Sequence, residues 1–268
     1  MDYDISHLLK SWPYHPGEVS VRRFIGRDGR EKIQMRVDLG ILQMNTTGRP
    51  DGKRPFGFST LFGYYNSLLR KHMLENNGND RSFLLDPKDC AELQMEMLQY
   101  HNRSICMLQL QDYEAVLRDT QRNFDILDFV EAYAITDDLA WSVVQFWPQV
   151  VIIRVRAEAA MAVELVEDDK AIKIVERGIQ ELRDFYTRTC HTHLIERSNE
   201  IVELTRLIED IRRNKPLTIR EQFQKLLEAA LRVEDYEEAA RLRDGIRRLD
   251  AISQKKNSKR KSMGRENE

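Results

Sequence analysis

The side chains that could do chemistry are few and scattered. Cys190 and His193, in the stretch TCHTH, are three residues apart, so on a helix they would share a face and could bind zinc. A zinc site needs further ligands, and the sequence brings no second pair near them. We therefore expect no metal and no cofactor, and we interpret this stretch as the start of a helix with half-exposed histidines.

Acid and base groups also lack the companions that catalysis requires. The stretch ELVEDDK, residues 164–170, is acidic, and we interpret it as a solvated helix end and turn rather than as a metal site or an acid/base pair. The histidines His15, His72 and His101 have no serine or cysteine in a nucleophile motif beside them. We therefore predict no catalytic residues and no enzymatic activity.

A loop rich in glycine and proline carries three cations. It reads TTGRPDGKRPFGF, residues 46–58, and its cations are Arg49, Lys53 and Arg54. Its glycine spacing fits neither the phosphate-binding P-loop nor the dinucleotide fingerprint. Two interpretations remain open: a loop that binds an anion or an acidic partner, and an ordered connector with solvated charges.

The first 58 residues have the pattern of a small β-sheet. Two apolar runs flank the turn GRDG, whose Asp28-Gly29 pair permits the positive φ of a tight hairpin. Beyond the turn, apolar side chains alternate with polar ones. The apolar set is Ile33, Met35, Val37 and Leu39, and the polar set is Gln34, Arg36 and Asp38. This period of two predicts an antiparallel sheet of two or three strands with one buried and one solvated face.

From Ser59 the apolar period becomes that of a helix. Ser59 or Thr60 is the expected N-cap of the first helix, and Asp86 before Pro87 opens the next one. Pro148 is expected in the first turn of a later, long helix. A short seam of leucine and isoleucine seven residues apart, Leu194 to Ile211, predicts a helix that packs on its neighbours or on a twin helix.

Two stretches of this helical region resemble tetratricopeptide repeats. In residues 91–129, Tyr100 is the bulky residue of the first helix and Ser104 is the small residue at the close approach. In residues 155–179, Ala159 takes the small position, and Ala171 and Gly178 are the small contacts of the second helix. The two matches lie about 55 residues apart rather than about 34, so the resemblance implies paired helices without a regular solenoid.

Residues 219–250, IREQFQKLLEAALRVEDYEEAARLRDGIRRLD, resemble the UVR motif. This helical hairpin is found in UvrB, in UvrC and in bacterial activators of protein-arginine kinases. The resemblance runs over the whole stretch, with Asp235-Tyr236 at the turn and Glu237, Ala240 and Arg243 on the second helix. More loosely, the whole chain resembles uncharacterised bacterial proteins that contain a UVR motif.

Two short helices cannot bury enough apolar surface to fold stably alone. The hairpin's apolar stripe is therefore predicted to bind a second UVR hairpin, another protein or the rest of this chain. The stripe consists of Phe223, Leu226, Leu227, Ala230, Leu231, Leu242, Ile246 and Leu249. The family's hairpins pair with one another, which favours a partner.

The chemistry of the better-known UVR proteins is not visible in this sequence. A P-loop and helicase motifs, as in UvrB, paired nuclease acids, as in UvrC, and CxxC zinc pairs, as in the kinase activators, are all missing. The three cysteines are spread out, which is typical of a reducing cytoplasm, and no long apolar run or signal-like start is present. We expect a soluble, cytoplasmic and bacterial protein.

The predicted protein is mainly α, with four parts. These are a β-rich region at 1–58, a tetratricopeptide-like helical domain at 59–214, the UVR hairpin at 217–250 and a basic disordered tail at 251–268. The expected function is that of a non-enzymatic adaptor, which pairs through its UVR hairpin with a UVR-bearing protein or with itself. The alternative is an accessory, nucleic-acid-associated protein of a UvrABC-type repair complex. Acidic residues outnumber basic ones between 61 and 218, which argues against a large nucleic-acid footprint.

Overall fold

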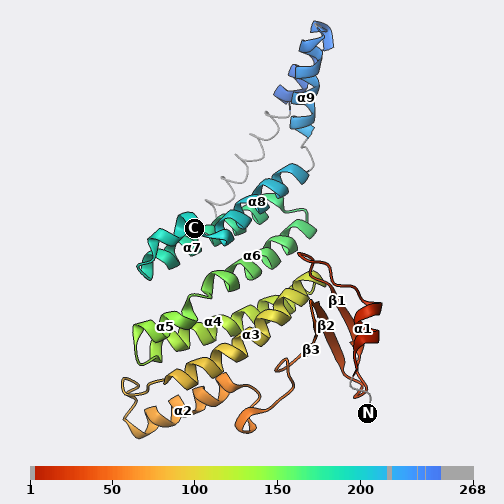
Figure 1. The fold of residues 1–268 in the computed structure, drawn as a ribbon. Coiled ribbons are helices and arrows are strands. Elements are labelled where there is room, and N and C mark those ends of the chain that lie inside the picture. The colour runs from red at the N-terminus through yellow and green to blue at the C-terminus, as the bar shows by residue number, and fades with distance from the viewer. Residues whose placement is uncertain (1–3, 216–218, 234, 239, 249–268) are drawn as a thin grey trace, which may run out of the picture. The chain divides into compact units, whose positions relative to one another are not determined.

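The structure is a computed structural model that describes residues 4–215, 219–233, 235–238 and 240–248. The chain divides into two compact units, Met1–Arg212 and Arg213–Glu268. The first unit holds a short helix, a small sheet and most of the helices, and the second holds the UVR hairpin. The fold is mainly α with an antiparallel sheet near the N-terminus, as the sequence predicts (Figure 1).

A short helix, α1 (Ser6–Ser11), precedes the sheet, whose strands are β1 (Val21–Ile25), β2 (Glu31–Val37) and β3 (Gly40–Asn45). They pair antiparallel in the order β1-β2-β3. The predicted turn between β1 and β2 is confirmed, because Gly29 has a φ of +72°. On one face, Ile33 and Met44 are buried and join the main apolar core.

The alternation predicted along β2 is correct only in part. Leu39 is 88% exposed because the tight turn into β3 takes it out of the strand. Arg36 was predicted to be solvated, yet it is 8% exposed. Its guanidinium donates to the carbonyl oxygens of Trp12 and Gly40, so the sequence before β1 and the β2–β3 turn cover the polar face there.

Three helices follow the loop, which contains the short 3₁₀ turn η1 (Pro55–Gly57). They are α2 (Leu61–Glu75), α3 (Pro87–Gln109) and α4 (Tyr113–Tyr133). The predicted caps are confirmed: the Thr60 side chain accepts from the Gly63 N–H, and Asp86 forms a capping box. α3 and α4 form a hairpin in which Ser104 is completely buried.

A second hairpin follows the short helix α5 (Asp137–Val144). It consists of α6 (Trp147–Glu164), with Pro148 in its first turn as predicted, and α7 (Asp168–Arg188). Ala159 and Ala171 are buried in it. A Cβ atom added to Gly178 would lie 2.5 Å from a methyl carbon of Val155, so glycine permits the close approach of the two helices.

The two hairpins have the same turn, 55 residues apart. Gln111 and Val166 both have a φ of +59°. The next residue's N–H reaches back to the carbonyl five positions earlier, from Asp112 to Met107 and from Glu167 to Ala162, at 2.9 Å in each case. The paired helices that the sequence predicts are therefore present, and α6 of the second hairpin packs on α4 of the first (Figure 1).

The segment after α7 differs from its prediction. Leu194 lies in a 3₁₀ turn, η2 (Thr192–Arg197), and not in the helix α8 (Asn199–Asn214). Ser198 separates the two because its hydroxyl accepts from the Ile201 N–H and caps α8. The helix that carries the seam is shorter than predicted, but the seam residues pack. Leu204, Ile208 and Ile211 join the core of the first unit. Ile201 packs against that core, and Leu194 packs against a second cluster that contains Phe185.

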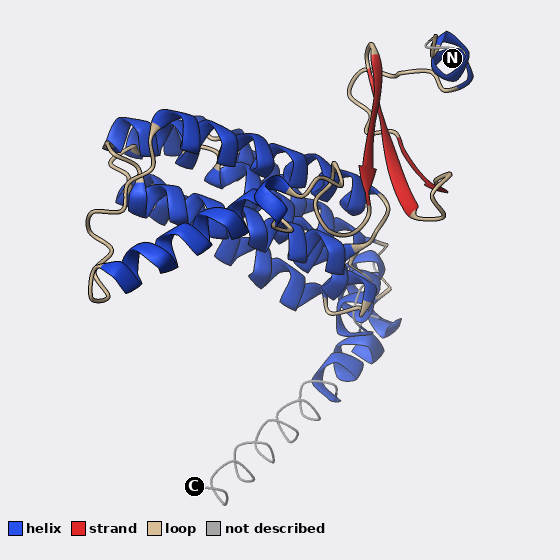
Figure 2. Cartoon of the chain, turned by 90° about the horizontal axis from the view of Figure 1, so that it is seen from below, coloured by secondary structure: helices blue, strands red, loops and turns tan. Residues whose placement is uncertain are grey.

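The sheet is fastened to one end of the first helical hairpin. Arg23 in β1 bonds Asp112, at the α3–α4 turn, at 2.5 Å. The sheet accordingly lies at one end of the stacked helices (Figure 2). No helix among the described residues is long and apolar enough to cross a bilayer.

Candidate interaction sites

The UVR hairpin begins with α9 (Ile219–Arg232) and returns through helical residues 236–238 and 240–248. Its turn resembles those of the first unit. The Asp235 N–H donates to the Ala230 carbonyl at 2.9 Å, and the Asp235 carboxylate accepts from the Glu238 N–H at 3.1 Å. The aspartate thus caps the second helix, as Asp112 caps α4.

The two helices of the hairpin enclose a small apolar interior. Ala230 and Leu242 are 7% exposed, and Phe223 and Leu227 pack against them. A Cβ atom added to Gly245 would lie 2.5 Å from the Phe223 ring, so glycine makes room for that ring. An interior of this size stabilises the hairpin weakly.

The structure divides the predicted partner-binding stripe into two sets. Five of its members are buried or half-buried: Phe223, Leu227, Ala230, Leu242 and Ile246. Leu226 and Leu231 point outward, with 56% and 50% of their surface exposed. Leu249 lies outside the described residues. Among the described members, Leu226 and Leu231 therefore offer the most surface to a partner while the hairpin keeps its own interior.

Two more large side chains are exposed beside them. Val233, at the turn, is 74% exposed, and Tyr236, where the second helix begins, is 68% exposed. We call Leu226, Leu231, Val233 and Tyr236 the outer apolar set. The apolar period does not predict Val233 and Tyr236 as partner-binding residues, because the turn interrupts the helical repeat between them.

The cationic loop is bound to the first unit through Arg49. Its guanidinium lies 2.8 Å from Glu96 of α3 and 2.9 Å from Asp51. The Glu96 carboxylate is completely buried and also accepts from the N–H groups of Leu61 and Phe62, at the start of α2. The anion that Arg49 contacts is therefore part of this chain. Lys53 and Arg54 are exposed, and an anion bound by them stays a prediction.

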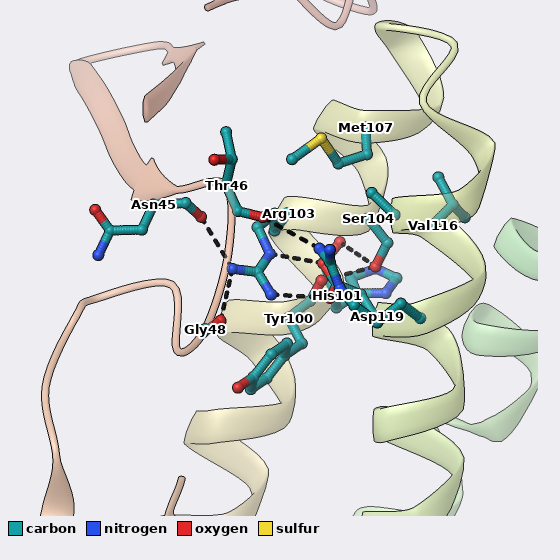
Figure 3. Close-up of polar contacts among 12 residues, drawn as sticks. Asn45, Thr46, Gly48, Tyr100, His101, Arg103, Ser104, Met107, Val116 and Asp119 are labelled. Atoms are coloured by element: carbon teal, nitrogen blue, oxygen red, sulfur yellow. Dashed lines mark hydrogen bonds and ion pairs between the residues drawn. The ribbon is translucent and has the colours of Figure 1, made fainter. Parts of the chain in front are cut away.

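A second buried pair holds the start of the same loop (Figure 3). Arg103 of α3 and Asp119 of α4 are each 1% exposed and form two hydrogen bonds, at 2.6 and 2.8 Å. The remaining Arg103 nitrogen donates to the carbonyl oxygens of Asn45 and Gly48. Arg118 adds a bond to Asp119 at 3.1 Å. Because burial of an isolated charge is costly, these contacts fix the loop against the α3–α4 hairpin.

Glu96, Arg103 and Asp119 are not among the site residues predicted from the sequence. A signal was present, because Glu96 and Arg103 fall on the stripe of α3 that also contains Leu93 and Tyr100. A charge on an apolar stripe indicates a buried partner. Nothing in the sequence names that partner, since the Arg103–Asp119 contact crosses from one helix to the next.

The residues around Cys190 are arranged by an aromatic contact. The His191 ring stacks on Trp141 of α5, with 3.7 Å between the ring centres. Cys190 is exposed and has a φ of +60°, just after the end of α7. Among the described residues, no group of three His, Cys, Asp or Glu side chains is placed to hold a metal ion.

Comparison with known proteins places one motif in the chain. Residues 220–252 match the family model described as "UvrB/uvrC motif" (UVR). The chain is thus a mainly helical protein with a small N-terminal antiparallel sheet that carries a UVR motif near its C-terminus. The match covers a minor part of the 268 residues. No curated protein and no solved structure gives a match.

Proposed function

We propose that this chain is a non-enzymatic adaptor that binds a protein partner through its UVR hairpin. The partner is a UVR-bearing protein or a second copy of the chain, in the cytoplasm of a bacterium. The observation that carries the proposal is a matched UVR hairpin whose outer apolar set is half or more exposed.

The outer apolar set would supply part of the free energy of pairing. Full burial of a large apolar side chain contributes about 1.5–3 kcal/mol, so covering the exposed part of these four would contribute roughly 3–6 kcal/mol before the costs of association. A second hairpin would supply a matching apolar surface. The charges along the hairpin add little, because its ion pairs, such as Arg241–Glu237, are exposed.

The test compares variants of the full chain. In the first, Leu226→Asp is combined with Leu231→Asp, which removes exposed apolar surface and leaves Ala230 and Leu242 in place. The matched control is Gln224→Asp, which adds an acid at an exposed polar position of the same helix. Sedimentation equilibrium measures self-association, and titration with a purified UVR-motif protein measures pairing. Circular dichroism checks that each variant keeps its helices.

We expect the double variant to lose pairing and the Gln224 control to keep it. Pairing should change little with added salt, because the interface is apolar. The opposite result would be loss of binding on changing Lys259 and Lys261 to alanine, together with steep weakening by salt. These two results together would favour the alternative, a nucleic-acid-associated protein, over the adaptor. Both lysines lie in the tail, outside the described residues.

A shortened chain tests whether the partner binds to the UVR hairpin. A chain that ends at Asn214 should keep the melting transition of the first unit, because that unit has its own core, and should lose pairing. Retained pairing would show that the partner binds elsewhere.

A further inference from the structure

A groove of about 740 Å³ runs between α2 and α4 and is open to solvent. Aromatic side chains line it: Phe62 and Phe129 meet edge to face at 5.5 Å, with Tyr133 farther along α4. Phe58 stands at one end, where it contacts Tyr64 at 5.7 Å. An aromatic groove between two helices suits a large apolar side chain of a bound segment.

Phe58 is linked through Tyr64 to a further aromatic ring, that of Phe56. Phe56 is 66% exposed and stacks on Tyr64, with 4.2 Å between the ring centres. Its φ is +50°, a left-handed conformation that is costly for a phenylalanine. The chain therefore holds an exposed aromatic ring against Tyr64 at a cost in backbone energy.

The groove also carries charges of both signs. Arg70 and Arg122 contribute cations, and Asp125 and Asp128 contribute carboxylates. Arg122 is half-buried, and its guanidinium lies 5.6 Å from the centre of the Phe62 ring. Within the part of the chain that the structure describes, no carboxylate pairs with Arg122. Arg49 and Arg103, by contrast, each pair with a carboxylate.

On the acidic side of the groove, Asp128 forms no ion pair within the part of the chain that the structure describes. Burial, followed by repulsion from Glu131, raises the pKa of Asp128, although Arg188 partly offsets this. That arginine is bonded to Glu131 at 2.6 Å. A cation on a bound segment could therefore form an ion pair with Asp128.

We propose that this groove is a second docking surface, which binds a peptide segment of a partner protein. The segment would bear a large apolar side chain with an acidic residue and a basic residue on either side of it. The apolar side chain would lie against Phe62 and Phe129, the carboxylate would pair with Arg122, and the cation would pair with Asp128. A nucleic-acid strand fits less well, because Asp125 and Asp128 would repel its phosphates.

The inference is independent of the UVR hairpin, and it gives the proposed adaptor the second binding surface that an adaptor needs. The experiment uses the full chain with Leu226→Asp and Leu231→Asp, so that the hairpin does not contribute. A displayed library of random peptides is selected on this protein. We expect the enriched peptides to share an apolar residue flanked by charges of opposite sign.

The decisive step is charge reversal in the groove. For a synthetic peptide of the enriched sequence, Arg122→Glu should weaken binding about tenfold or more, as measured by fluorescence anisotropy. A peptide with its acidic residue changed to lysine should regain binding to that variant. Asp128→Lys, at an exposed position, should show the converse preference. Arg156→Glu, at an exposed position of α6, is the matched control and should change nothing.

Several results would overturn the proposal. One is no enrichment, and another is enriched peptides that bind the Arg122 and Asp128 variants unchanged. Binding of a single-stranded oligonucleotide that depends on Arg122 would assign the groove to nucleic acid. Concentration-dependent dimerisation that Arg122→Glu abolishes would assign it to a second copy of the chain. Failure of the hairpin experiment alone would leave all these outcomes unaffected.

Discussion

Removing one partner of the buried Arg103–Asp119 pair should destabilise the first unit strongly. Asp119→Leu leaves a guanidinium that is 1% exposed without its carboxylate, and such a loss costs about 3–5 kcal/mol. Arg103→Met leaves Asp119 with Arg118, whose side chain is 48% exposed, so the remaining charge is partly compensated. It also removes the donor for two loop carbonyls, at about 1–3 kcal/mol each when they stay unsatisfied.

A double variant tests whether Arg103 and Asp119 stabilise the first unit as a pair or independently of each other. Arg103→Met with Asp119→Leu removes both charges, so it should cost less than the sum of the single changes, by about 2–3 kcal/mol. The free energy of unfolding is measured by urea titration and tryptophan fluorescence. All three tryptophans, Trp12, Trp141 and Trp147, lie in the first unit, so the signal reports on that unit.

An exposed ion pair is the control. Lys71 and Glu75 on α2 lie 3.8 Å apart with most of their surface in solvent, so Glu75→Ala should change stability by less than about 1 kcal/mol. If the two single changes at Arg103 and Asp119 add to within about 0.5 kcal/mol, the side chains do not act as a pair and the reasoning is wrong.

Three further predictions concern the first unit. Ala159→Leu should overpack the α6–α7 hairpin and cost about 1–3 kcal/mol in urea unfolding, whereas Val163→Leu, at an exposed position of the same helix, should cost little. Burial lowers the pKa of His101 in the folded protein, so as the pH falls His101 is protonated in the unfolded chain before it is protonated in the folded one. Stability is then full above about pH 6.5 and falls as the pH drops toward the folded-state pKa, and His101→Gln should lack this component. Cys190 is exposed and should react first with a thiol reagent, because burial raises the pKa of Cys106 to about 12 and that of Cys90 to about 11; rapid labelling of all three native thiols would contradict this.

The sequence predicts best where the signal is local. The Asp28-Gly29 turn, the caps Thr60 and Asp86 and the position of Pro148 each depend on a few neighbouring residues, and all are confirmed. The helical hairpins are expected from the resemblance to tetratricopeptide repeats, and paired helices are present at both stretches. Periodicity fails where a turn interrupts it, as at Leu39, because the pattern does not report where a strand ends.

The contacts that position the loop could not be predicted, because they join residues far apart in the sequence. Arg49 meets Glu96 across 47 positions, and Arg103 meets Asn45 across 58. The cations of the loop can be recognised in the sequence, but the sequence does not indicate that Arg49 forms an ion pair with a carboxylate of the same chain. In the UVR hairpin, the stripe of apolar residues was visible, but an apolar period does not tell which members face the sister helix and which face outward.

The valine in the α6–α7 turn has a consequence for the order of folding. Val166 keeps a left-handed backbone that a β-branched residue resists, and its side chain is 73% exposed. The turn therefore gains little from its own sequence, and the packing of α6 on α7 must stabilise it. An isolated segment around Val166 would not hold this shape in solution. We therefore expect the left-handed turn to form together with the contacts between α6 and α7, and not ahead of them.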